Sequence, residues 1–132
     1  MRIDLHTHST ASDGTESPAA LVRAASSAGL DVVALTDHDT VAGWPEALDA
    51  LPPGLRLLRG TEISSVFDGI SLHLLGYGID PAYAPLADEM AMALDDRVPR
   101  ARAIIGKLEA AGYPVSWDKL MANVPPLSLI HI

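Results

Sequence analysis

Short apolar segments alternate with polar loops over the first eighty residues of the chain. Four segments have the pattern of β-strands: 3–9, 30–36, 55–63 and 71–79. The second of these is continuously apolar in its middle, as expected of a strand that is buried on both faces. Because helical patterns separate the strands, the sequence predicts an α/β fold with a parallel sheet and crossover helices, either open or closed into a barrel.

The segments between and after the predicted strands have patterns typical of α-helices. Ser17 before Pro18 is a favourable helix start, with a capping side chain ahead of a proline at the first helical position, and Gly29 is a natural end. A second helix is predicted to begin near residues 41–45 and to end by Leu51. A long helix is predicted over 81–112, and a short extended segment, 113–117, leads into another helix.

Two groups of side chains in the long helix invite different interpretations. Apolar residues at helical spacing are predicted to pack in the core: Met90, Met92 and Leu94. The basic residues are predicted to form a solvated helix face rather than to contact an anionic substrate: Arg97, Arg100, Arg102 and Lys107.

The amino-acid composition limits the metal ligands and the binding partners that the protein can have. The 132 residues make one domain or part of one, and the absence of cysteine leaves imidazole and carboxylate as the ligands for any transition metal. The formal net charge of −8 disfavours generic binding of polyanions, so stable binding of duplex nucleic acid is not expected. There is no signal-like N-terminus and no membrane-length apolar run, which predicts a cytoplasmic protein without membrane contact.

Polar residues follow or interrupt the predicted strands. His6 and His8 are two residues apart on one strand, so their side chains point to the same side. Parallel strands present their carboxyl ends to a common face, where ligands bind. Unrelated core or surface histidines are the alternative, but burying such groups without partners is unfavourable. We therefore predict a metal cluster at this face, with six ligands: His6, His8, Asp13, His38, Glu62 and His73.

Three further carboxylates are ambiguous. Asp37 and Asp39 flank His38, and either could orient a ligand histidine or serve as a helix cap or loop residue. Asp4 could act in the same way or begin the first strand.

Four segments together resemble the motifs of the polymerase and histidinol phosphatase (PHP) family. They are Asp4–Ser9 with Ser12-Asp13-Gly14, Leu35–Thr40, Gly60–Ser64 and Leu72–Tyr77. The resemblance covers residues 1 to about 123 and is strongest to the stand-alone phosphoesterase branch, which includes enzymes like 3′,5′-nucleoside bisphosphate phosphatases and 5′→3′ exoribonucleases.

The resemblance implies a distorted seven-stranded TIM-like β/α barrel with a trinuclear site, of which this sequence holds only the first four or so β/α units. By motif, His6, His8 and Glu62 would hold one ion, and Glu62 would bridge to a second ion that also takes His73. Asp13 and His38 would belong to the third. Two or three divalent ions are therefore expected, of manganese, zinc or iron. The family's later ligands, a histidine in a His-Pro-type motif and a terminal Asp-x-His pair, have no counterpart here.

The implied activity is metal-dependent hydrolysis of phosphate monoesters, on a nucleotide or short oligonucleotide such as short RNA. Hydrolysis of another small metabolite, such as histidinol phosphate, and a non-catalytic PHP module are the alternatives. Residues 1–126 are predicted to form a partial PHP domain. Residues 127–132 resemble a translated sequencing adapter, so His131 receives no role, and the 132 residues alone are expected to be inactive.

Overall fold

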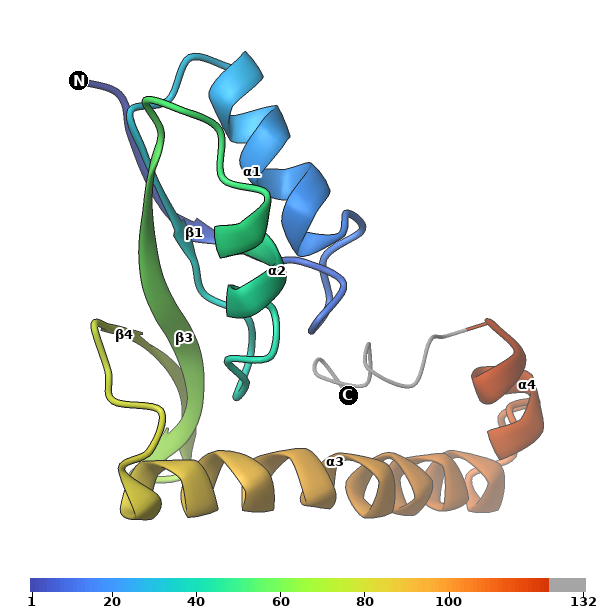
Figure 1. The fold of residues 1–132 in the computed structure, drawn as a ribbon. Coiled ribbons are helices and arrows are strands. Elements are labelled where there is room, and N and C mark those ends of the chain that lie inside the picture. The colour runs from blue at the N-terminus through green and yellow to red at the C-terminus, as the bar shows by residue number, and fades with distance from the viewer. Residues whose placement is uncertain (124–132) are drawn as a thin grey trace.

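The computed structural model describes residues 1–123 as four strands and four helices (Figure 1). The strands are β1 (Ile3–Thr7), β2 (Val32–Leu35), β3 (Arg56–Phe67) and β4 (Ile70–Tyr77). The helices are α1 (Pro18–Ser27), α2 (Trp44–Asp49), α3 (Ala84–Ala110) and α4 (Trp117–Asn123). The predicted tail at 127–132 lies outside the described residues, as does the end of the predicted domain 1–126.

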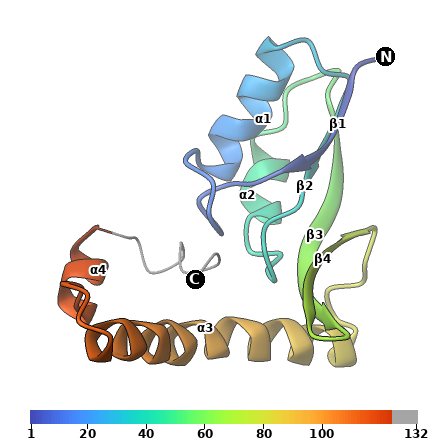
Figure 2. The same cartoon turned by 180° about the vertical axis from the view of Figure 1, so that it is seen from behind.

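The strands form one sheet in the order β1-β2-β3-β4. The first three are parallel, as predicted, and α1 and α2 make the crossovers between them on the same face of the sheet (Figure 1, Figure 2). The curved four-stranded sheet is consistent with part of a PHP-type barrel.

The prediction that the fourth strand is parallel to the others is wrong. β4 pairs antiparallel with β3 from Gly60 opposite Tyr77 to Phe67 opposite Ile70. The turn between them is Asp68-Gly69, both with positive φ, which is the conformation of a tight hairpin turn with the strand twist on either side. Because β3 runs to Phe67, Glu62 lies in the middle of a long strand and not at its end.

The apolar core lies between the parallel strands and the two crossover helices. Helix α1 starts as predicted, since the Ser17 hydroxyl accepts a hydrogen bond from the backbone N–H of Ala20. Indole Nε1 of Trp44 donates to the carbonyl of Gly60 at 3.0 Å, which ties α2 to β3. The buried core residues are Val22, Ala25, Val33, Leu35, Trp44, Ala47 and Leu55.

Helix α3 crosses the end of the sheet and extends beyond it (Figure 1, Figure 2). Met90 is buried against Thr61, but Met92 is 56% exposed, so the prediction of core packing is correct for the first and wrong for the second. Arg97 is buried, which corrects the prediction of a solvated basic face at this position. Arg100 and Arg102 are exposed, as predicted.

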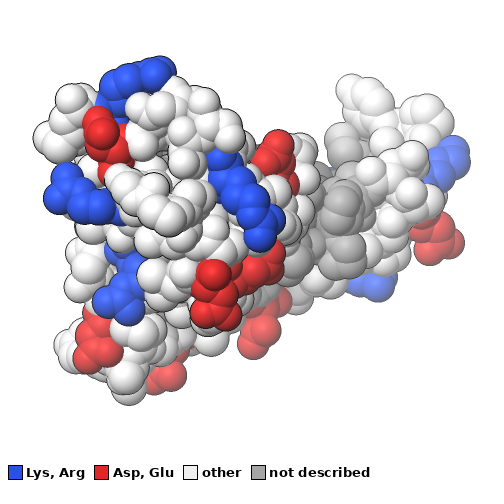
Figure 3. All heavy atoms as spheres, turned by 45° about the horizontal axis from the view of Figure 1, so that its top comes forward, with Lys and Arg blue, Asp and Glu red and all other residues white. Residues whose placement is uncertain are grey.

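The surface carries mixed charge. On the face drawn in Figure 3, acidic and basic side chains of the described residues are interspersed. Among residues 1–123, no helix is both long and apolar enough to span a bilayer.

Candidate metal centre

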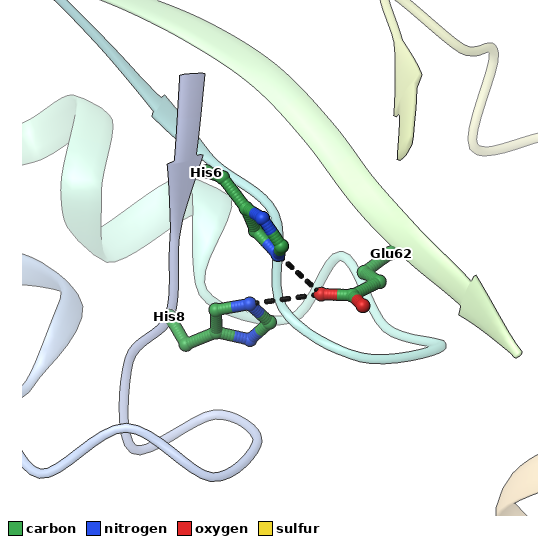
Figure 4. A group of neighbouring side chains, drawn as sticks. All are labelled: His6, His8 and Glu62. Carbon is green, nitrogen blue, oxygen red and sulfur yellow. Dashed lines mark hydrogen bonds and ion pairs between the residues drawn. The ribbon is translucent and has the colours of Figure 1, made fainter. Parts of the chain in front are cut away.

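The first group of converging side chains comes from β1 and β3. His6 lies on β1 and His8 directly after it, and both rings point toward Glu62 (Figure 4). His6 Nε2 lies 2.5 Å and His8 Nε2 3.0 Å from the same oxygen, Oε2 of Glu62. Two imidazoles directed at one carboxylate oxygen form a group with the spacing of a metal site.

The second group adds the loop that follows β1. His8 Nδ1 lies 3.1 Å from Oδ1 of Asp13, and His38 Nε2 lies 3.7 Å from Oδ2 of the same carboxylate. The loop is held by backbone hydrogen bonds to the Ser9 carbonyl from the N–H groups of Ser12 and Gly14. Asp13 thus faces both rings because the chain folds back on the end of the strand.

The third group joins the end of β2 to the hairpin. The backbones of His38 and Glu62 form an isolated parallel bridge, which extends the pairing of β2 with β3 beyond Leu35. His38 Nε2 lies 3.7 Å from Oε2 of Glu62, and His73 Nδ1 lies 2.7 Å from Oε1. His73 therefore reaches the site from the middle of an antiparallel strand, a route that the strand-end argument did not include.

All six predicted ligands are thus brought together. The ligand atoms of three overlapping groups lie within 4.8 Å of one another: His6 with His8 and Glu62, His8 with Asp13 and His38, and His38 with Glu62 and His73. His8, His38 and Glu62 each belong to two groups. The assignment of all six residues as metal ligands remains a prediction, which this clustering supports.

The pKa values of His38 and Glu62 are both lowered, which favours the deprotonated forms of these two side chains. Burial lowers the pKa of the His38 imidazole, and the charges of His8 and His73 act in the same direction, outweighing Glu62 and Asp13. Burial alone would raise the pKa of Glu62, but the hydrogen bond from His6, the charge of His38 and the hydrogen bond from His73 bring it below its usual value. A neutral imidazole and an ionised carboxylate are the forms that bind metal ions.

The donor set fits divalent cations. Glu62 is only 4% exposed, and an ionised carboxylate in that position needs a partner of opposite charge or strong hydrogen bonds. The two carboxylates of the centre, Asp13 and Glu62, supply the negative charge that attracts a cation. Nitrogen and oxygen donors without sulfur suit zinc, manganese or iron(II).

Two carboxylates beside His38 belong to none of the three ligand groups but form hydrogen bonds with the segments around them. Asp37 accepts hydrogen bonds from the Ser9 and Ser12 hydroxyls, and Asp39 accepts from Ser64 and Arg97. These contacts fit the loop role that the sequence left open beside orientation of a ligand histidine. Asp4 Oδ1 accepts from the backbone N–H of His6 at 3.2 Å, a local contact at the start of β1.

Sequence reasoning missed the donors to these carboxylates. Ser64 had a usable signal, because it stands two residues after Glu62 on the same strand. Arg97 had one as well, since it is seven residues after the core residue Met90 and four before the buried Ala101.

The fold and the six-residue cluster define an α/β domain with a candidate centre for divalent metal ions. The PHP domain family model matches residues 4–109, and the chain belongs to that family. The chain is 42% identical over 118 residues to a 5′-3′ exoribonuclease of Haemophilus influenzae, covering 89% of this chain and 43% of the relative. It is 38% identical over 120 residues to a 3′,5′-nucleoside bisphosphate phosphatase of Chromobacterium violaceum, covering 90% and 42% of the two chains.

A solved structure supports the same assignment. The chain superposes on a proposed metal-dependent phosphoesterase from Bifidobacterium adolescentis with a TM-score of 0.82 and 37% sequence identity, over 98% of this chain and 46% of the other. The sequence therefore spans less than half the length of the relatives that it matches.

Proposed function

We propose that the complete protein carrying these residues hydrolyses phosphate monoesters on nucleotides or short oligonucleotides. The observation that carries the proposal is the convergence of four histidines and two carboxylates on one point, with Glu62 contacting His6, His8 and His73. The relatives named as a nucleoside bisphosphate phosphatase and an exoribonuclease support the substrate class.

The residues of the centre would hold two or three divalent ions. Bound ions of this kind supply Lewis-acid activation of water and stabilise charge on phosphoryl oxygens. Glu62, shared by two groups, would fix the spacing between neighbouring ions. The protein side chains would hold the ions and the phosphoryl group in fixed positions relative to one another. No protein nucleophile is required. His6, about half exposed, lies at the open side of the centre, where a substrate would enter.

The test is substitution of the shared carboxylate. With manganese present, the complete protein should release phosphate from a 3′,5′-bisphosphonucleoside. Glu62→Gln should reduce kcat/KM by more than the ~10–100-fold typical of a residue that orients a metal ligand. Glu89→Gln, an exposed acid on α3, is the matched control and should keep wild-type activity.

Substrate choice is tested separately. Histidinol phosphate and a short 5′-phosphorylated RNA should be compared with the bisphosphonucleoside on the same preparation. Equal or better turnover of histidinol phosphate would transfer the assignment to a small-metabolite phosphatase. Full activity in Glu62→Gln would contradict the shared-ligand role.

A further inference from the structure

A buried arginine lies directly behind the metal centre. Arg97 is only 6% exposed, although it belongs to a helix whose other basic residues face solvent. Its Nη2 atom lies 2.5 Å from Oδ2 of Asp39 and 3.4 Å from the backbone carbonyl of His38. A buried guanidinium requires such acceptors. Both belong to the short segment that presents the His38 imidazole.

We propose that Arg97 is a positioning residue that acts through Asp39 to hold the group formed by His38, Glu62 and His73. It contacts neither an ion nor the substrate in this role. The inference rests on the proposed function only in that the group binds a divalent ion.

The backbone at Asp39 shows why a holding contact is needed. Asp39 has φ of 53°, in the left-handed region that residues with a Cβ seldom occupy. Such a conformation persists where the surrounding structure fixes it. Here the Asp39 carboxylate accepts from the backbone N–H and the hydroxyl of Ser64, each at 2.7 Å, and from Arg97. Arg97 also neutralises the carboxylate, which is 1% exposed.

The contacts of Asp39 reach the three ligands of the third group. Ser64 follows Glu62 by two residues on β3, and it is the residue paired with His73 across the hairpin. His38 immediately precedes Asp39. One carboxylate therefore ties the segment that carries His38 to β3, at the residue that pairs with His73, and Arg97 holds that carboxylate.

The charge of Arg97 and its proposed positioning role predict opposite changes in cation affinity when Arg97 is removed. Removal of a positive charge near a cation site would, by Coulomb attraction alone, tighten binding of the cation. Removal of a positioning contact would weaken it, since partners that orient metal ligands typically contribute 10–100-fold in affinity. The sign of the change thus separates the two explanations.

The experiment is a calorimetric titration of the metal-free complete protein with Mn²⁺. His73→Asn and His6→Asn serve as references that identify the binding steps of the third and first groups. We expect Arg97→Gln to weaken, by about 10–100-fold, the step that is lost in His73→Asn, and to leave the step lost in His6→Asn within about twofold of wild type. Arg97→Lys retains the charge and should recover part of the affinity.

Arg100→Gln is the matched control, because Arg100 lies on the same helix and pairs with Asp96 at the exposed surface at 3.6 Å. Its titration should match that of the wild type. Circular dichroism at the titration temperature confirms folding. Should Arg97→Gln not fold, Ser64→Ala removes one hydrogen bond to Asp39 and should weaken the same step to a smaller extent.

Unchanged or tighter binding in Arg97→Gln, or equal weakening of every step, would overturn the positioning role. In the fallback variant, an unchanged Ser64→Ala titration would do so. Failure of the wild-type protein to bind Mn²⁺ and, in parallel titrations, Zn²⁺ and Fe²⁺ would overturn the proposed metal centre itself, which distinguishes the two claims.

Discussion

Asp37 and Asp39 flank the same histidine, yet the structure uses them differently. Each is 1% exposed and each carboxylate accepts three short hydrogen bonds. The donors to Asp37 are all neutral: the backbone N–H and hydroxyl of Ser9 and the hydroxyl of Ser12. Asp39 receives two neutral donors from Ser64 and one guanidinium from Arg97.

The two carboxylates also hold different parts of the centre. Asp37 binds the start of the loop that carries Asp13, so its contacts support the group of His8, Asp13 and His38. Asp39 binds β3 and α3, so its contacts support the group that includes His73. Within residues 1–123, Asp37 forms no ion pair with lysine or arginine, whereas the charge of Asp39 is compensated by Arg97. Hydrogen bonds from neutral donors therefore satisfy one buried carboxylate, while the other depends on a guanidinium from a helix that is distant in the sequence.

The largest effect is expected from Asp39→Asn. The amide keeps the size of the side chain but leaves the guanidinium of Arg97 buried without a charged partner, which costs about 3–5 kcal/mol. Urea unfolding of the metal-free protein measures the loss. Asp96→Asn, on the exposed pair with Arg100, is the control and should change stability by less than about 1 kcal/mol.

Asp37→Asn should cost less, about 1–3 kcal/mol, because no cation is left unpaired and the serine hydroxyls can rotate to accept from the amide. Hydrogen exchange should show faster opening of residues 9–14 and unchanged protection of β3. A loss equal to or greater than that of Asp39→Asn, measured by the same unfolding experiment, would reverse the comparison.

The sequence predicted which side chains cluster better than it predicted the residues that form hydrogen bonds around the cluster. His6 and His8 were predictable from strand periodicity, and His38 from its place after a buried strand. His73 lies in the predicted cluster, but it does not reach it as expected, because its strand is antiparallel and does not end at the site. The signal for the hairpin was present in Asp68-Gly69, a dipeptide typical of tight turns between strands.

Arg97 shows what local patterns cannot supply. Its helical spacing from Met90 places it on the buried face, but a charged residue there is ordinarily solvated. Only the tertiary placement of α3 beside Asp39 provides the acceptor that makes burial favourable. The number and identity of the bound ions likewise depend on three-dimensional ligand geometry and not on residue spacing.

The smallest effect is expected at Gly43, which lies beside the Asp37 carboxylate. A Cβ there would lie 2.9 Å from Oδ2 of Asp37, 3.1 Å from Cγ of Pro18 and 3.2 Å from Cδ2 of Leu35. The backbone of Gly43 is in the right-handed helical region, so alanine introduces crowding without backbone strain. Gly43→Ala should therefore cost about 1–2 kcal/mol by overpacking and displace the Asp37 carboxylate.

Gly106→Ala is the matched control for this prediction, since a Cβ at that helical position meets nothing within 4 Å. It should raise the free energy of unfolding by about 0.5–1 kcal/mol, as alanine does in place of glycine inside a helix. The two substitutions add the same methyl group. Opposite signs of the change in the free energy of unfolding would therefore show that the loss in Gly43→Ala comes from crowding of its neighbours. A stabilising Gly43→Ala would show that the Asp37 carboxylate has room to move, and that its three neutral donors hold it less rigidly than Arg97 and Ser64 hold Asp39.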